Sequence, residues 1–134
     1  MILIKVIILA IASVLKFIFG YEGVNLLFRV SPSRLIIAVL RRYGAEIGSC
    51  VRIQSPFLIH NADQIEPIYS NLIIGNNCYI GRDCIFDLMD KITIGDQVTI
   101  SHRAILNTHT NAGKSPLSKT TFKPTVGSIN IKDG

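Results

Sequence analysis

Tryptophan is absent from the sequence, aromatic residues make up 7% of it, and charged residues make up 17%. Proteins that bind single-stranded nucleic acid rely on stacked aromatic side chains beside a cationic groove, so this composition argues against that function. Hydrophobic residues make up 49% of the chain, and the mean hydropathy is +0.41. This apolar content excludes a disordered chain or a coiled coil, because it is enough to form a buried core. At 134 residues, the chain suits one domain and is too short for two independent cores.

Cysteine is also scarce, with three residues at positions 50, 78 and 84. Their number is odd and no two of them form a C-x-x-C pair, so neither a disulfide framework nor a zinc ribbon is indicated. We expect reduced, buried thiols that behave as small apolar side chains.

Acidic residues are nearly missing from the first 43 positions, where Glu22 is the single example. The same stretch has six Lys or Arg residues, which give it the whole net charge of +5. The remaining residues contain eight cations and eight anions. The excess charge is therefore confined to an N-terminal part, residues 1–43, which we expect to be helical.

The N-terminal part begins with an apolar run over residues 1–19 that only Lys5, Ser13 and Lys16 interrupt. In a helix these three side chains would share one stripe, roughly 80° wide. Such a helix fits best in a membrane interface, with its apolar face in the lipid and its lysines at anionic head groups.

Three other interpretations of residues 1–19 stay open. The helix could pack on a neighbouring subunit or on the rest of the domain. It could be a secretory signal, although no small-x-small cleavage site follows the apolar run. It could also span a membrane, but a span usually needs about 20 apolar residues. The stretch between the two lysines, Val6–Leu15, has ten residues, and Ser13 is one of them.

A second, shorter helix is predicted after a break at Gly20. Ser31 is suited to cap it, because a hydroxyl can accept a hydrogen bond from a free backbone N–H, and Pro32 suits the first turn. Gly44 favours a stop. We therefore expect an amphipathic helix of about three turns that ends before Gly44.

Over residues 44–134 the bulky apolar residues recur at every sixth position. Three triplets of hexapeptides keep this spacing and start at Ile47, Ile74 and Ile94. The first residue of each unit is large and apolar, the second is often glycine or serine, and the fifth is smaller. We expect three-residue strands with their middle side chains inward, joined by tight corners that need glycine or small polar residues. Three hexapeptides would then close one triangular coil.

Insertions interrupt the repeat at defined places. The coil starts are 27 and 20 residues apart, more than three hexapeptides need, which predicts a loop around His60–Ser70 and a minor insertion later. After Leu106 the spacing resumes only near Ile131, which predicts a long excursion over residues 107–127. Long excursions from a rigid scaffold often carry function. A β-sandwich, the main alternative, would show period-two alternation and hairpin dipeptides, and neither dominates here.

The units Ile74–Tyr79, Ile80–Ile85 and Ile94–Thr99 resemble the hexapeptide repeats of the left-handed parallel β-helix acyltransferases. With the lead-in Leu40–Gly48, the resemblance is nearer to the sugar O-acetyltransferases of the maltose, galactoside and capsule-polysaccharide type. It covers about residues 32–134. The resemblance implies an all-β solenoid, a left-handed parallel β-helix of about three coils, preceded by N-terminal α-helices.

In the resembled enzymes, a histidine just after the third strand of this coil is the general base, and His109 occupies that place. It would deprotonate an acceptor hydroxyl, which then attacks the thioester of acetyl-CoA directly. Asp87 resembles an acid that contacts the acceptor in these enzymes, and Asn107 would place a backbone group near His109, so both are candidates for acceptor binding. A local capping role stays open for both. His60 and His102 are expected to be structural or exposed.

The implied function is acetyl transfer from acetyl-CoA to a sugar hydroxyl, in the assembly of surface polysaccharide or lipopolysaccharide. The resemblance also implies a homotrimer with His109 near a subunit boundary, in the cytoplasm or at the inner face of the cytoplasmic membrane. The residues Ile131–Gly134 look like the opening of another hexapeptide, so we expect a truncated family member. The alternative is a catalytically incompetent solenoid that acts as a membrane-associated binding or structural module. No metal site is expected, because the three histidines lack the spacing of a metal-binding solenoid.

Overall fold

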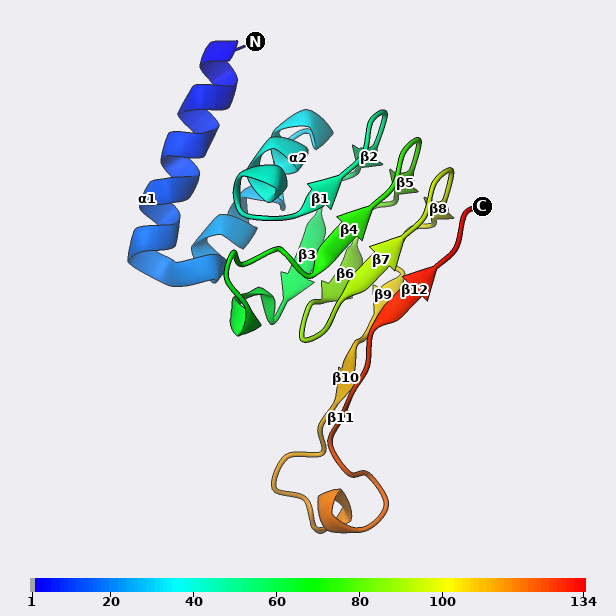
Figure 1. Cartoon of the computed structure of the whole chain (residues 1–134). Coiled ribbons are helices and arrows are strands. Elements are labelled where there is room, and N and C mark those ends of the chain that lie inside the picture. Colours follow the sequence, from blue (N-terminus) through cyan, green and yellow to red (C-terminus); the bar gives the residue numbers. More distant parts are fainter. Residues whose placement is uncertain (1) are drawn as a thin grey trace.

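The computed structural model describes residues 2–134 and shows two N-terminal helices followed by three sheets of short parallel strands (Figure 1). From β1 to β9, strands that follow one another in the chain belong to different sheets, which is consistent with the predicted solenoid. The first sheet contains β1 (Glu46–Ile47), β4 (Leu72–Ile74), β7 (Ile92–Ile94) and β12 (Ile129–Ile131). The second contains β2 (Arg52–Ile53), β5 (Tyr79–Ile80) and β8 (Thr99–Ile100). The third contains β3 (Phe57–His60), β6 (Cys84–Asp87) and β9 (Ile105–Leu106).

The parallel pairing aligns the first residues of the hexapeptides from coil to coil. Ile47 pairs with Ile74, Ile74 with Ile94, and Ile94 with Ile131. The predicted spacing between coil starts is therefore confirmed, and so is the return of the repeat at Ile131. Aligned aliphatic side chains form continuous buried ladders, and the removal of this apolar surface from water stabilises the stack.

The strands present their side chains differently from what we expected. In β4, Leu72 and Ile74 are buried while the middle residue, Ile73, is partly exposed, and β7 has the same pattern. The expectation of inward middle side chains was wrong. Each strand of the coils contains the sixth residue of one hexapeptide and the first residue of the next, and the longer strands also include the fifth residue. Alternation along the strand therefore turns the sixth residue outward.

The corners and the glycines have separate roles. Residues in the fourth place of the hexapeptides, such as Asn77 (φ 56°) and Asp83 (φ 58°), adopt the left-handed conformation that turns the chain. We expected glycine or small polar residues at these corners, and Asn77 and Asp83 are small polar residues, whereas the glycines of the second place lie outside the corners. Instead, the glycine in the second place permits close stacking, since a Cβ atom on Gly75 would lie 2.6 Å from the backbone of Gly95 in the next coil.

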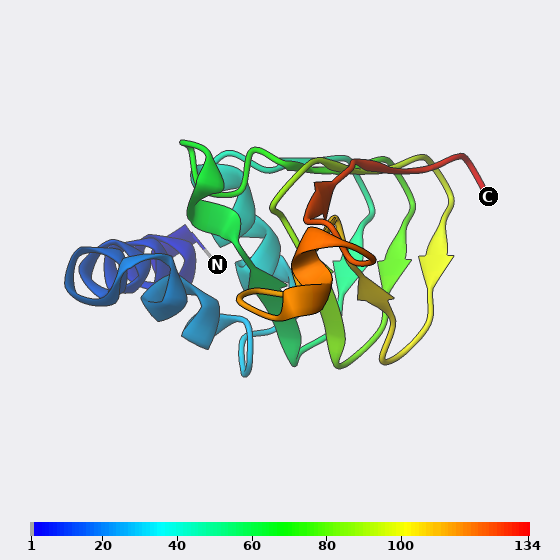
Figure 2. The same cartoon turned by 90° about the horizontal axis from the view of Figure 1, so that it is seen from below.

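Two helices, α1 (Ile2–Leu27) and α2 (Ser33–Arg42), cover the first coil at one end of the molecule (Figure 2). A strand without a neighbour exposes unpaired backbone groups, so the first coil needs partners on each of its faces. The helical part, residues 2–43, supplies a hydrogen-bonding partner on each of these faces. These hydrogen bonds join the Arg41 guanidinium to the Ile47 carbonyl, the Ile53 N–H to the Ser33 hydroxyl, and the Phe57 N–H to the Phe28 carbonyl.

The start of α2 differs from the prediction, which placed the cap at Ser31. The residue before the helix is Pro32, at φ −67° and ψ 152°, and no side chain caps the helix there. Ser31 is therefore not the N-cap. Ser33 is the first helical residue, and its hydroxyl accepts a hydrogen bond from the first coil instead. Gly44, at φ 108°, follows the end of the helix as predicted.

The helix α1 is kinked at Gly20, whose φ of 63° and ψ of −153° lie in a region open almost only to glycine. Beyond the kink the helix is anchored in the core. The Asn25 side chain donates to the Ile59 carbonyl at 2.8 Å and accepts from the Tyr69 hydroxyl at 2.8 Å. Gly20 therefore separates this anchored end from an outer segment, residues 2–19.

Two excursions leave the coils where insertions were predicted. The first lies between β3 and β4 and contains the short 3-10 helix η1 (Ala62–Gln64). The second forms an arm in which β10 (His109–Thr110) pairs antiparallel with β11 (Thr125–Val126), with η2 (Pro116–Lys119) between them. Figure 1 shows this arm projecting away from the three sheets.

The cysteines differ in their surroundings. Cys78 and Cys84 are buried in the coils, which confirms the prediction for these two. Cys50 is exposed, and the prediction was wrong there, because its place at a left-handed corner turns the side chain outward.

The close stacking of the coils can be tested with Gly75→Ala. The added methyl group would press on the backbone of Gly95, so we expect a loss of about 1–3 kcal/mol of unfolding free energy, the usual range for overpacking. Chemical denaturation measures this loss. Gly127→Ala is the matched control, since a Cβ atom there meets no atom within 4 Å, and it should leave stability nearly unchanged. Equal effects of both substitutions would contradict the role assigned to Gly75.

Candidate active site

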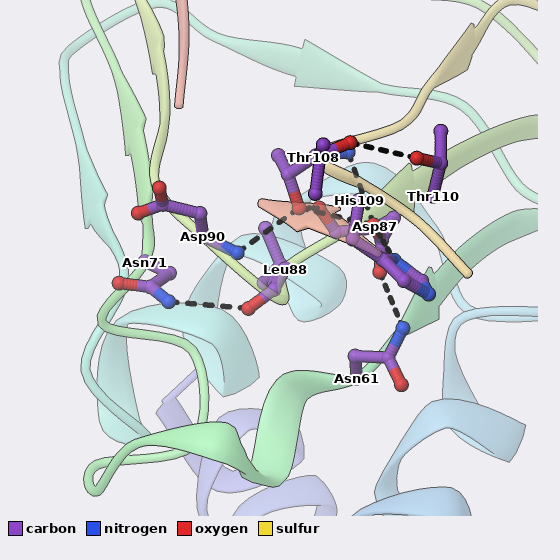
Figure 3. Close-up of polar contacts among 9 residues, drawn as sticks. Asn61, Asn71, Asp87, Leu88, Asp90, Thr108, His109 and Thr110 are labelled. Carbon is purple, nitrogen blue, oxygen red and sulfur yellow. Dashed lines mark hydrogen bonds and ion pairs between the residues drawn. The ribbon is translucent and has the colours of Figure 1, made fainter. Parts of the chain in front are cut away.

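Asp87 and His109, both singled out in the sequence, lie in contact beside the third sheet (Figure 3). Asp87 is the last residue of β6, and β6 pairs with β9 so that Phe86 aligns with Leu106. His109 begins β10, soon after β9 ends. The register between the second and third coils therefore brings together two residues that are 22 positions apart.

The contact is made through one nitrogen of the imidazole ring. The distance from His109 Nδ1 to Asp87 Oδ2 is 2.6 Å. Because a carboxylate can only accept, this bond places a proton on Nδ1 and leaves Nε2 of the neutral ring unprotonated. None of the described residues hydrogen-bonds to Nε2, and the His109 side chain is 28% exposed. The ring can therefore accept a proton from a group that approaches from outside.

Asp87 is 2% exposed, and hydrogen bonds stabilise its buried carboxylate. Oδ1 accepts from the Asn61 amide, and Oδ2 accepts from the Thr108 N–H at 3.0 Å in addition to His109. Burial alone would raise the pKa of Asp87. The hydrogen bonds from Asn61, His109 and Thr108 outweigh burial and lower the pKa to about 2, so Asp87 is ionised at neutral pH.

Thr108, the residue before His109, hydrogen-bonds both to the end of β6 and to the loop that follows it. Thr108 is 3% exposed, and its hydroxyl lies 2.8 Å from the backbone carbonyl of Asp87 and 3.0 Å from Oδ2 of the same residue. The hydroxyl oxygen also accepts the Asp90 N–H at 3.0 Å. These bonds hold the carboxylate and the imidazole in a fixed relation to each other (Figure 3).

A shallow groove of about 270 Å³ opens beside His109. Pockets for drug-sized ligands are usually about 300–1,000 Å³, so this groove has room for reacting groups and not for a whole coenzyme. Residues on both strands of the arm line it, namely Asn107, Thr108, His109, Thr110, Thr125, Val126 and Gly127. A larger hollow of about 640 Å³ lies between α1 and the first excursion, but neither Asp87 nor His109 borders it.

The other candidate residues are placed as follows. Asn107 lines the groove with an exposed side chain, and within the described residues it takes no part in the hydrogen bonds around Asp87. His60 is exposed at the end of β3, and His102 is exposed at a corner, where its Nδ1 accepts the Arg82 N–H at 2.8 Å. Both histidines match the expected structural or exposed roles.

Two residues of the network, Asn61 and Thr108, were missed in the sequence. A signal for Asn61 existed, because the spacing of 27 residues between the first two coils aligns its neighbour His60 with Asp87. Thr108 directly precedes His109, but nothing in the repeat indicates that its hydroxyl turns inward. No group of three or more His, Cys, Asp or Glu side chains suited to a metal ion occurs in residues 2–134.

The pKa of Asp87 predicts how acid affects stability. The pKa falls from its ordinary value of 3.8 to about 2 on folding, so the stabilisation is complete above about pH 4 and is lost as the pH falls toward 2. The difference corresponds to about 2 kcal/mol. Asp87→Asn should remove this part of the pH dependence when the unfolding free energy is measured between about pH 5 and 2. An unchanged pH dependence in the variant would show that Asp87 is not the group responsible.

The two histidine environments predict opposite tautomers. His109 should carry its proton on Nδ1, whereas His102 should carry it on Nε2, because its Nδ1 accepts a backbone N–H. Nitrogen NMR of the neutral imidazoles distinguishes the two forms. In Asp87→Ala the His109 signals should shift toward a mixture of tautomers while those of His102 stay fixed. A His109 ring protonated on Nε2 in the parent protein would contradict the described contact.

No family model matches the chain, and no curated protein matches its sequence. The structure is similar to the crystal structure of a hexapeptide-repeat-containing acetyltransferase from Vibrio cholerae, with a TM-score of 0.65 and 19% sequence identity. The alignment covers 91% of this chain and 64% of that chain, so this chain spans less than two thirds of the length of the other protein. At this identity the similarity shows a shared fold, and it agrees with the hexapeptide pattern of the sequence.

Proposed function

We propose that this protein is an acyltransferase that moves an acyl group from an acyl-coenzyme A thioester to a hydroxyl group, with His109 as the general base. The observation that carries the proposal is the 2.6 Å contact between His109 Nδ1 and Asp87, because it leaves Nε2 able to accept a proton in the groove. The fold shared with a hexapeptide-repeat acetyltransferase supports this class of reaction.

In the proposed reaction, Nε2 of His109 removes the proton of the acceptor hydroxyl while the hydroxyl oxygen attacks the thioester carbonyl carbon. A C–O bond forms, the C–S bond breaks, and the leaving thiolate takes the proton from the imidazolium. The products are one ester and one thiol, and His109 returns to its starting form. An acyl-enzyme is not required, and the buried Cys78 and Cys84 are poorly placed to form one.

Asp87 acts in this proposal as a positioning residue. The resemblance suggested an acceptor contact, but the Asp87 carboxylate is buried and both of its oxygens already have partners. An acceptor would have to compete with Asn61, Thr108 and His109 for this carboxylate. A buried carboxylate in this position holds the imidazole in one tautomer and stabilises the imidazolium that forms during proton transfer. Asn107, exposed in the groove, stays the candidate for acceptor binding.

The finer assignments rest on the resemblance of the hexapeptide units. We propose acetyl-CoA as the donor and a sugar hydroxyl as the acceptor, in the assembly of surface polysaccharide or lipopolysaccharide. The protein would work in the cytoplasm or at the inner face of the cytoplasmic membrane. A homotrimer of left-handed coils would place a second subunit beside the small groove, which by itself is too small for a whole coenzyme.

The decisive variant is His109→Ala, assayed as thiol release from acetyl-CoA with a panel of sugars and the full chain. Loss of a general base should lower the rate about 10²–10⁴-fold. His102→Ala is the matched control, because His102 is an exposed corner histidine outside the groove, and it should keep the rate of the parent. The unfolding transition of His109→Ala should stay cooperative, which separates loss of activity from loss of fold.

Two results would contradict the proposal. If His109→Ala transferred acetyl groups as fast as the parent, His109 would not be the base. If the parent released no thiol with any acceptor, the alternative would take its place, namely a catalytically incompetent solenoid that serves as a membrane-associated binding or structural module.

A further inference from the structure

The outer segment of α1, residues 2–19, is a surface that the proposed reaction does not use. Many of its long apolar side chains face outward, with Phe17 92% exposed, Leu3 70% and Ile18 59%. A window of 18 residues in α1 has a mean hydropathy of 2.6, and 6% of that window is buried. By length and composition the helix is apolar enough to cross a membrane. An exposed apolar surface of this extent marks an interaction site.

Ser13 and Lys16, two of the three polar side chains of the outer segment, contact the protein. The Lys16 ammonium lies 3.6 Å from the Glu66 carboxylate and above the ring of Tyr43, and the hydroxyls of Ser13 and Tyr43 are 3.2 Å apart. Ala12, on the same side of the helix, is fully buried. We expected the lysines at lipid head groups. The structure shows Lys16 paired with the protein, which leaves the opposite side of the helix apolar.

We infer that the outer segment lies flat in one leaflet of an anionic membrane, with its polar side still docked on the protein. With 100° between successive residues, the outward apolar side chains cover roughly 160° of the helix circumference. They are Leu3, Ile4, Val6, Ile7, Ile11, Val14, Phe17 and Ile18. No described residue in this sector is polar. This inference does not depend on the proposed acyl transfer.

The width of the apolar sector distinguishes a lipid surface from a second copy of the chain. Two packed helices share a narrow seam, about two residues in seven, so most of this sector would stay in water in a helix pair. Protein interfaces also have a polar rim, and the sector has none. A lipid leaflet covers the whole width, as it does for other interfacial helices.

The contacts of the inner side distinguish a helix lying in the membrane from one that crosses it. A crossing helix would have to leave the protein, which would break the Lys16–Glu66 ion pair, separate Ser13 from Tyr43 and expose the packing of Ala12. A helix in the plane of the membrane keeps all of these contacts. It buries the same outward side chains about 5–10 Å into the boundary between head groups and acyl chains.

The charge of the helical part suits an anionic membrane. Residues 1–43 contain six Lys or Arg residues and one acid, whereas the rest of the chain is neutral. Arg29, after the end of α1, and Arg42, at the end of α2, are both exposed. Cations near an anionic leaflet add an electrostatic attraction that salt weakens.

Flotation of the full chain with vesicles of equal parts phosphatidylcholine and phosphatidylglycerol tests the inference. The parent should float with the vesicles. Phe17→Asp should lower the partition coefficient at least tenfold, because a charge replaces the most exposed aromatic side chain of the sector. Phe122→Asp, which changes a phenylalanine 59% exposed on the arm, is the matched control and should float like the parent.

The depth of the helix can be measured because the chain contains no tryptophan. Ile11→Trp and Phe17→Trp each introduce a single fluorophore on the outward side, and lipids brominated at different depths quench it. A helix lying flat predicts the same shallow depth for both positions. A crossing helix would place position 11 near the centre of the bilayer and position 17 closer to its surface, which would overturn the flat orientation.

Failure of the parent to float would overturn the inference. If the parent instead formed an oligomer without lipid that Phe17→Asp dissociated, a second copy of the chain would be the true occupant of the apolar sector. Equal flotation of Phe17→Asp and Phe122→Asp would also contradict the assigned surface. These outcomes are independent of the acetyl-transfer assay, so the two proposals can fail separately.

Discussion

The alignment of each coil on the next is the constraint on which the rest of the molecule depends. Paired isoleucines such as Ile74 and Ile94 fill the inside, and glycine at the second place lets neighbouring coils approach within contact of each other's backbone. A shift of one residue would turn the buried side chains outward, so the register is strongly specified. The same register fixes the relative positions of the residues of the candidate site. Asn61 follows the first coil, Asp87 ends a strand of the second, and His109 follows the third.

The helical part provides hydrogen-bonding partners for the first coil of the stack. The first coil has no preceding coil to pair with, and Arg41, Ser33 and Phe28 satisfy its backbone groups on the three faces. The same helices place the outer segment of α1 against the protein through its polar side. The two helices together therefore end the stack and present an apolar surface, and the kink at Gly20 separates the outer segment of α1 from the end that is anchored in the core.

The spacing of the coils could be predicted from the sequence because burial recurs at every sixth residue, and these positions hold large apolar residues. It also placed Asp87 and His109 among the candidates. Features that depend on three-dimensional neighbours could not be read in this way. The close approach at Gly75 requires knowledge of the adjacent coil, and the inward hydroxyl of Thr108 depends on how the arm leaves β9. The predicted cap at Ser31 was wrong for the same reason. The helix begins at Ser33, and the Ser33 hydroxyl accepts a hydrogen bond from Ile53 of the first coil, a contact that the sequence alone does not show.

The central claim is that coil register brings the carboxylate of Asp87 and the imidazole of His109 into direct contact. A double-mutant cycle on the unfolding free energy tests it most directly, using Asp87→Ala, His109→Ala and the double variant. Residues in contact are expected to show a coupling of about 0.5–3 kcal/mol, and the account predicts a value of about 1 kcal/mol or more. Effects that add within about 0.3–0.5 kcal/mol would mean that the two side chains do not interact, and would contradict the account.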